Sequence, residues 1–454
     1  MRPEADGFDR VGKFLVDSRQ VDPEQASAIL AATQVTVWAG EGVRGSLADQ
    51  AFLLTLVNLM PRVFKRPLRV QAGEGVLAAK LRVPWPTASL GEALRVMGAE
   101  CIEAGTPASA DVCLGGGGDG QYRAIHRGWC VDLAPPDWPG RLAPGPSHAL
   151  TGVASAGLYL AEKFFDVCGV HAAALNRPVG LSLWRPDLAA DDPAALGPGQ
   201  VYLPAELWLM GLGHLGQGVL WAWSMLPYQE RSGVQILLQD FDRAVPANFG
   251  PQALMMQADT GRRKTWIAAR FLEARGFDPG IVDRRVDEGT RRDISEPALC
   301  IAAFDGGGPR WLLDDLGFDA TVVVGVGGSV SSFDDIEIHT LPLTSGKAKD
   351  IWKPGSLSAS AERLATTNAY YRRVRVEKRC GDLELAGVSV AVPFVGAVTG
   401  ALAVADLIRI VSGGQQFAFH GLELRSGELG RHRIRDTLLR PRLVNGFQQA
   451  RAVT

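Results

Sequence analysis

Polar and charged side chains follow one glycine-rich loop in the second half of the chain, and their order would suit nucleotide chemistry. The loop reads Gly211-x-Gly213-x-x-Gly216 and lies between two apolar segments. Glycines in such a loop let the backbone approach a phosphate, which also faces the N-terminus of the helix that follows. The side chains that come next are Asp240, Asp242, Asn248, Gln252, Asp259, Lys264 and Asp305.

The glycine loop alone does not say which nucleotide would bind. An acidic residue at the end of the second strand, such as Asp240, could equally hold the ribose of a nicotinamide cofactor in a dehydrogenase. Single members of the series also have structural interpretations. Lys264 could be a solvated helix residue, Asn248 a turn former, and Asp305 a turn residue beside three glycines.

The elements that must position these residues are present twice. A second loop, Gly40-x-Gly42-x-x-Gly45, also follows an apolar strand and precedes a helix with apolar spacing of three and four. Downstream, Cys113 stands opposite Cys300 in matching segments of strand and glycines, and residues 152–169 align without gaps with residues 396–413. Three matches in the same order indicate a duplicated βαβ architecture.

We therefore predict an α/β protein built of two Rossmann-like halves. A chain of 454 residues is too long for one comfortable core. The stretch 183–200 is rich in Pro, Asp, Ala and Gly and is predicted to be the linker between residues 1–182 and 201–454.

Composition narrows the classes of partner and compartment. With 47 basic and 49 acidic residues the net charge is −2, so neither nucleic acid nor an anionic membrane is an expected partner. The N-terminus lacks the apolar core of a signal peptide, which predicts a cytoplasmic protein. The apolar run 391–411 is interrupted by Asp406 and Arg409, so we expect a buried helix. Six cysteines without a CxxC pair make structural zinc improbable.

The polar series resembles the ThiF/MoeB and ubiquitin-activating enzyme superfamily. The pattern of that family runs from the glycine loop through D-x-D, N-x-x-R-Q and D-x-G-x-x-K to a catalytic aspartate. The resemblance covers residues 201–330 strongly and 380–415 more weakly. It implies two adenylation-fold halves packed as a pseudo-dimer, with an inactive N-terminal half, because Ala72 and Gly118 stand opposite Asp240 and Asp305.

The resemblance also implies a role for each residue, with ATP and Mg²⁺ as cofactors. The three loop glycines would cradle the nucleotide, Asp240 would hold ribose hydroxyls, and Asp305 would help to hold Mg²⁺ near the reacting centre. The other members of the implied nucleotide site are Asp242, Asn248, Gln252 and Lys264, of which Asn248 and Lys264 would contact phosphates.

Two departures from the family pattern affect this site. His214 replaces a loop glycine, and Pro251 stands where the family has the arginine of N-x-x-R-Q. One preorganised charge can stabilise a transition state by several kcal/mol. We hypothesise that Arg19 reaches across from the N-terminal half to replace the arginine that is missing at Pro251. Arg19 could also be an ordinary surface residue. Arg262 and Arg263 are close in sequence as well.

A polar, basic segment, residues 343–379, is expected to be a mobile crossover that passes over the tail of the activated protein. Cys380 follows it, beside Lys378 and Arg379, a setting that favours the thiolate. Cys380 is the plausible nucleophile, or else a buried cysteine that covers the start of a helix. Cys113 and Cys300 lie in apolar strands and are predicted to be inert core residues.

The reaction implied by the resemblance is ATP-dependent adenylation of the C-terminal carboxylate of a small ubiquitin-like protein with a flexible tail. Transfer to Cys380 and then to a conjugating enzyme would follow, as in bacterial conjugation systems, some of which act in antiphage defence. The alternatives are a scaffold that binds such a tail without activating it, favoured by Pro251, and a nicotinamide dehydrogenase, disfavoured because no catalytic His, Tyr or Lys arrangement accompanies the loop.

Overall fold

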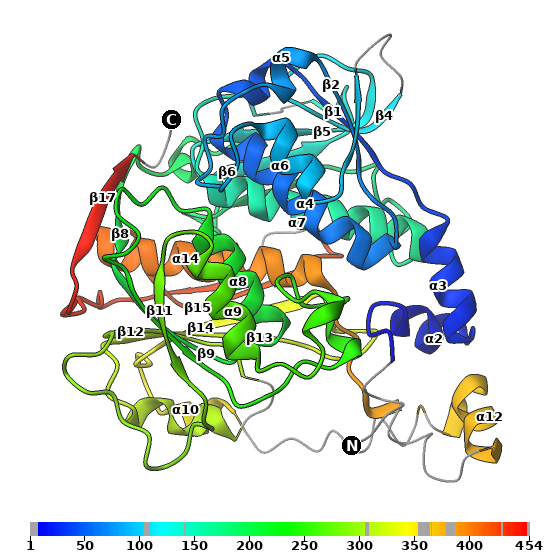
Figure 1. The fold of residues 1–454 in the computed structure, drawn as a ribbon. Coiled ribbons are helices and arrows are strands. Elements are labelled where there is room, and N and C mark those ends of the chain that lie inside the picture. Colours follow the sequence, from blue (N-terminus) through cyan, green and yellow to red (C-terminus); the bar gives the residue numbers. More distant parts are fainter. Residues whose placement is uncertain are drawn as a thin grey trace.

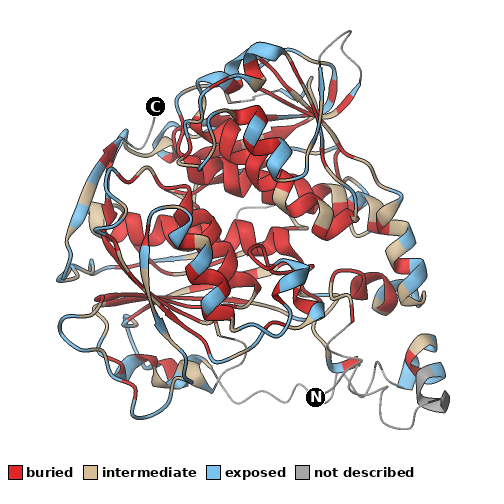
Figure 2. Cartoon of the chain, in the orientation of Figure 1, coloured by how far each residue is buried: buried red, intermediate tan, exposed pale blue. Residues whose placement is uncertain are grey.

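The computed structural model describes residues 8–103, 109–139, 142–304, 308–352, 364, 366–377, 386–427 and 430–451, without the side chains of 374–377. In this part of the chain two large sheets lie on opposite sides of the molecule, and four long helices run between them (Figure 1). Figure 2 shows that these helices are buried along most of their length.

The N-terminal sheet is a doubly wound sheet with an antiparallel edge. Its strands in the described residues are β1 (Thr36–Ala39), β2 (Arg69–Ala72), β3 (Glu100–Glu103), β4 (Ala110–Leu114), β5 (Gly120–Arg127), β6 (Cys130–Ala134) and β7 (Val179–Ser182). Their spatial order is β3-β2-β1-β4-β5-β6-β7. The first five strands are parallel, and β6 and β7 are antiparallel to their neighbours.

The C-terminal sheet repeats this order. Its strands in the described residues are β9 (Glu206–Met210), β10 (Gln235–Gln239), β11 (Asp278–Val282), β12 (Leu299–Ala302), β13 (Ala320–Val326), β14 (Asp335–Leu341), β15 (Phe417–Glu423) and β16 (Arg431–Ile434). They are arranged as β11-β10-β9-β12-β13-β14-β15-β16. Trp38 pairs with Cys113 in one sheet and Trp208 pairs with Cys300 in the other. The shared order and register confirm the predicted duplication.

Small residues bring the central helices into backbone contact. These helices are α4 (Leu47–Phe64), α7 (Ala149–Cys168), α8 (His214–Ser224) and α14 (Pro393–Ser412). A Cβ placed on Gly218 would lie 2.0 Å from the carbonyl oxygen of Gly396, and a Cβ on Gly152 would lie 2.0 Å from that of Ala48. The helix pairs α8–α14 and α4–α7 therefore cannot tolerate side chains at these crossings.

The two halves share one core. Phe164 of α7 and Phe394 of α14 have ring centroids 5.4 Å apart, and one cluster of buried apolar residues extends through both sheets. Both α7 and α14 end at a glycine in the left-handed region, Gly169 with φ +61° and Gly413 with φ +69°. This is the predicted pseudo-dimer.

The remaining elements connect or flank the two halves. The helices are α2 (Lys13–Arg19), α3 (Pro23–Ala31), α5 (Glu74–Leu77), α6 (Leu90–Val96), α9 (Lys264–Glu273), α10 (Ala348–Ile351) and α12 (Ala369–Glu377). Short 3₁₀ turns span Glu41–Arg44, Pro193–Leu196, Pro246–Asn248, Gln257–Asp259 and Pro309–Asp315. Strand β8 (Gln200–Pro204) pairs with the C-terminal β17 (Phe447–Arg451).

Within the described residues one helix, α14, is long and apolar enough to cross a membrane, and 94% of its most apolar window is buried inside the protein. The expectation of a buried helix over residues 391–411 is confirmed.

Candidate functional site

A cavity of about 270 Å³ lies at the carboxyl ends of β9, β10 and β12. Ligands of doubly wound sheets bind in such a crevice, where the strand order reverses. Gly211, Gly213, Asp240, Asp242 and Lys264 all line the cavity. The structure therefore brings together five of the residues that the sequence singled out.

Each glycine of the loop meets a different steric requirement. Gly211 has φ +88°, a conformation that side chains disfavour. A Cβ on Gly216 would lie 1.9 Å from the carbonyl oxygen of Gly211, so Gly216 permits the tight turn without lining the cavity. Gly213 is the N-cap of α8, and no atom lies within 4 Å of the place where its Cβ would be. The N-terminus of α8 thus faces open space beside Gly213.

Asp240 is held in place by the backbone. Its Oδ2 accepts from Leu212 N at 2.6 Å, and its Oδ1 accepts from Asp242 N at 2.7 Å. Burial raises the pKa of the Asp240 carboxyl, and the nearby Lys264 ammonium opposes that shift. Because a carboxylate oxygen can accept more than one hydrogen bond, Asp240 can still accept from a ribose hydroxyl.

Lys264 begins α9 and points toward the same cavity. Its Nζ lies 2.8 Å from Asp242 Oδ2, and its side chain is 10% exposed against 46% for Asp242. A solvated helix lysine would not be buried in this way. The geometry gives Lys264 an exposed acidic partner that a phosphate oxygen could replace.

Asn248 and Gln252 do not line the cavity. Asn248 Oδ1 accepts from Val245 N at 3.1 Å, so Asn248 is a turn former in this structure. Gln252 Oε1 accepts from Gln217 Nε2 at 2.8 Å, which ties the loop 246–255 to α8. Both amides support the walls around the cavity.

An arginine of the N-terminal half does reach into the C-terminal half, but it is Arg62 of α4. Its Nη1 donates to the carbonyl oxygens of Phe249 at 2.7 Å, Gln252 at 2.8 Å and Met255 at 2.9 Å. Arg62 is 3% exposed, and burial lowers its pKa to about 10. Its guanidinium holds the loop that contains Pro251 and does not line the cavity. Arg62 is the single basic residue of an apolar helix, and this was the signal that could have identified it.

Arg19 lies at a different place. Its Nη2 is 2.9 Å from the position that a Cβ would take on Gly169, at the C-terminus of α7, where a helix dipole favours a cation. Arg19 does not line the C-terminal cavity. Arg262 pairs with Asp259 at 3.2 Å, and Arg263 donates to the carbonyl oxygen of Phe241.

Two arginines that the sequence analysis missed, Arg284 and Arg285, do line the cavity. The Cζ of Arg285 lies 3.7 Å from the ring centroid of Phe241, another lining residue. They follow β11 directly, so a basic pair at the carboxyl end of a strand was the available signal. They place positive charge at the cavity, which Pro251 does not provide because it replaces the family arginine.

The predicted magnesium ligand Asp305 and the predicted nucleophile Cys380 lie outside the described residues. The described cysteines are free thiols, and Cys113, Cys130, Cys168 and Cys300 are buried. Burial raises the pKa of the Cys300 thiol, which confirms the prediction of an inert core residue. Within the described residues no three His, Cys, Asp or Glu side chains form a metal-binding group.

Fold and site together define a duplicated α/β protein with a nucleotide-type glycine loop in its C-terminal half. The chain belongs to the BilD family: the family models "BilD N-terminal domain" and "BilD C-terminal domain" match residues 34–183 and 203–414. The "Bacterial E1-like protein BilD" of Collimonas sp. (strain OK412) is 31% identical over 417 residues, which is 90% of each chain. The resemblance to activating enzymes is thereby confirmed at the level of this E1-like family.

Solved structures resemble the chain more remotely. E. coli MccB with MccA-N7isoASN is 15% identical, with a TM-score of 0.31, over 52% of this chain and 64% of that one. E. coli tRNA N6-threonylcarbamoyladenosine dehydratase, TcdA, in complex with AMP is 16% identical, with a TM-score of 0.29, over 46% of this chain and 86% of that one. Family membership rests on the BilD comparisons.

Proposed function

We propose that the C-terminal cavity binds ATP and that the protein adenylates the C-terminal carboxylate of a small ubiquitin-like protein. The observation that carries this proposal is the convergence of Gly211, Gly213, Asp240, Asp242 and Lys264 on one cavity at the carboxyl edge of the sheet. The E1-like name of the Collimonas relative supports the same reaction.

The arrangement suits a nucleotide phosphate at one end and a ribose at the other. The open space beside Gly213 and the N-terminus of α8 would receive phosphate oxygens. Asp240 would accept from the ribose hydroxyls. Lys264 would exchange Asp242 for phosphate, and Arg284 and Arg285 would add the positive charge missing at Pro251. Alignment and charge neutralisation are the main requirements of carboxylate attack on the α-phosphate.

The site offers a partial donor set for Mg²⁺. This ion is usually bound by one or two carboxylates together with substrate phosphates. Asp242 carries the more exposed carboxylate beside the cavity, and Asp305 is proposed as the second ligand. When bound with ATP, Mg²⁺ would neutralise charge on the phosphates.

We further propose that Cys380 receives the activated carrier. Its thiolate would attack the acyl carbonyl of the adenylate, form a thioester and release AMP, and a conjugating enzyme would then accept the carrier. In the proposed domain organisation, residues 1–182 form an inactive half, residues 183–200 a linker, and residues 201–454 the active half with the crossover 343–379. The proposed setting is a bacterial conjugation pathway in the cytoplasm, with antiphage defence as the role to test by phage challenge.

The test combines the protein with ATP, Mg²⁺ and ubiquitin-like proteins encoded beside its gene. We expect a carrier adduct that thiols cleave, formed only with ATP. Cys380→Ala should lose the adduct but still release AMP slowly, whereas Asp240→Ala should lose both. Cys300→Ala is the matched control, because Cys300 is buried in β12, and it should form the adduct normally.

A carrier-binding scaffold is the second candidate, since Pro251 removes the family arginine and Arg62 is fully engaged with carbonyl groups. Tight carrier binding that is independent of ATP, with neither adduct nor AMP, would select the scaffold over the enzyme.

A further inference from the structure

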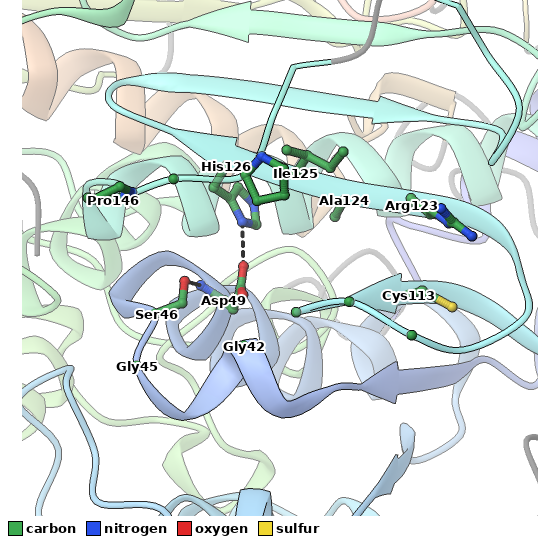
Figure 3. Close-up of a pocket in the computed structure, with 15 residues that line it drawn as sticks. Gly42, Gly45, Ser46, Asp49, Cys113, Arg123, Ala124, Ile125, His126 and Pro146 are labelled. Carbon is green, nitrogen blue, oxygen red and sulfur yellow. Dashed lines mark hydrogen bonds and ion pairs between the residues drawn. The ribbon is translucent and has the colours of Figure 1, made fainter.

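A second cavity, of about 560 Å³, lies in the N-terminal half at the carboxyl ends of β1 and β4 and beside β5 (Figure 3). The strand order reverses between β1 and β4, which is where doubly wound sheets form ligand crevices. Its volume falls within the range of about 300–1,000 Å³ typical of small-molecule sites.

This cavity is not a copy of the C-terminal one. The C-terminal cavity includes Asp240 and Asp242 at the end of β10, the counterpart of β2. The N-terminal cavity is lined instead from the β4 and β5 side, and the described residues at the end of β2 do not contribute. The absence of a ribose aspartate at Ala72 therefore does not argue against a ligand here.

One wall of the cavity is the glycine loop that leads into α4. Gly42, Gly45 and Ser46 line it, and Ser46 is the N-cap of α4, an 18-residue helix. No atom lies within 4 Å of the position that a Cβ would take on Gly45, so the loop borders open space. The N-terminus of a long helix favours negative ligand groups.

A buried polar pair that joins this wall to β5 points to a ligand independently. His126 Nδ1 and Asp49 Oδ1 are 2.7 Å apart, as the dashed line in Figure 3 shows. His126 lines the cavity, is 3% exposed, and its Nε2 is buried without a hydrogen-bond partner. A buried polar atom without a partner is uncommon in folded proteins. Because a carboxylate oxygen only accepts, Nδ1–H donates to Asp49, which fixes the ring and leaves Nε2 for a ligand.

The charges around the cavity favour an anion. Arg123 of β5 lines it, in addition to the helix terminus, and Asp49 is the acidic residue among the lining side chains. Asp49 forms a hydrogen bond with His126, which reduces the repulsion between its carboxylate and an anion in the cavity.

We infer that this N-terminal cavity binds a small phosphate monoester such as a sugar phosphate. The phosphate would lie at the N-terminus of α4 and form a hydrogen bond with His126 Nε2, and the organic body would occupy the space beside Gly45. A small carboxylate shares part of this chemistry and is distinguished by the test. The inference does not rest on the proposed adenylation, because the two cavities have no lining residue in common.

The test is isothermal titration calorimetry of the full chain with ribose 5-phosphate, inorganic phosphate and gluconate. Ribose 5-phosphate should bind once per chain and more tightly than the other two. Gly45→Leu should abolish this binding, because its side chain fills the cavity from a backbone at φ −103° that accepts any residue. Gly199→Leu is the control, since Gly199 is also exposed and open and lies in the linker.

Two further variants separate possible failures. His126→Gln should weaken ribose 5-phosphate binding about tenfold to a hundredfold, as expected for a lost hydrogen bond to a charged group. It serves as the decisive variant if Gly45→Leu does not fold. Asp240→Ala, in the other cavity, should leave the titration unchanged. No heat with ribose 5-phosphate, tighter binding of gluconate, or binding that survives both Gly45→Leu and His126→Gln would overturn the inference.

Discussion

Arg62→Met is the change that most directly tests how the N-terminal half supports the C-terminal site. It keeps an unbranched apolar stem in the core but removes the donor to three carbonyl oxygens of the loop 246–255. Nη1 carries two N–H groups, which these three acceptors share. A hydrogen bond to a charged group contributes about 1.5–3 kcal/mol net, so the contacts to the loop amount to about 3–6 kcal/mol.

Burial lowers the pKa of the Arg62 guanidinium from its ordinary value of 12.5 to about 10, so the group is desolvated and depends on these carbonyl oxygens. Because the hydrogen-bond contribution already includes the cost of desolvation, the expected loss of unfolding free energy is about 3–6 kcal/mol. Because Arg62 touches only this loop across the interface, amide hydrogen exchange should accelerate most over residues 246–255.

Chemical denaturation and hydrogen-exchange mass spectrometry measure the two effects. Arg66→Met is the matched control, because Arg66 is exposed and donates to the backbone of Ala31. It should change the unfolding free energy by less than about 0.5 kcal/mol. Unchanged stability of Arg62→Met, or unchanged exchange over residues 246–255, would refute this reasoning.

Three other changes have defined outcomes. Gly218→Ala should lower the unfolding free energy in urea by more than about 2 kcal/mol, because its Cβ would lie 2.0 Å from the carbonyl oxygen of Gly396; a wild-type midpoint would contradict this. His148 is buried, and burial lowers its pKa to about 3 from 6.5. The unfolded chain therefore binds more protons, so the contribution of His148 is fully present above about pH 6.5 and decreases as the pH falls, by about 2 kcal/mol at pH 5; His148→Asn, which keeps an N-cap acceptor, should reduce the acid-dependent loss in urea titrations by about this amount. Lys264→Met should raise the dissociation constant for ATP about tenfold to a hundredfold while changing stability by less than about 1 kcal/mol, because Asp242 is half exposed; equal ATP affinity would remove Lys264 from the site.

The duplicated fold could be predicted because its signals are local and periodic. Apolar strands followed by glycines mark the carboxyl edge of each sheet, and Cys113 and Cys300 lie at the same register in β4 and β12. Gly152 and Gly396, the first residues of the two aligned segments, both lie at helix crossings. Short-range patterns were sufficient for these features.

The contacts that complete the sites join residues far apart in sequence. Arg62 and its three acceptors are separated by 187 to 193 positions, and no local pattern connects them. Asp49 and His126 are 77 positions apart and meet only because the first turn of α4 approaches the end of β5. For Asn248 the difficulty is different. An asparagine at this position fits both phosphate binding, as in the family, and turn formation, so the sequence alone could not distinguish the two roles.

The most direct measurement of the central claim is ATP–pyrophosphate exchange with ubiquitin-like proteins encoded near this gene. Wild-type protein should exchange label only when a carrier with an intact C-terminal tail is present. Asp305→Ala and Asp240→Ala should lose the exchange, and Cys380→Ala should keep it, because exchange precedes thioester formation. Carrier binding without any exchange would contradict the account and leave the C-terminal cavity as part of a scaffold.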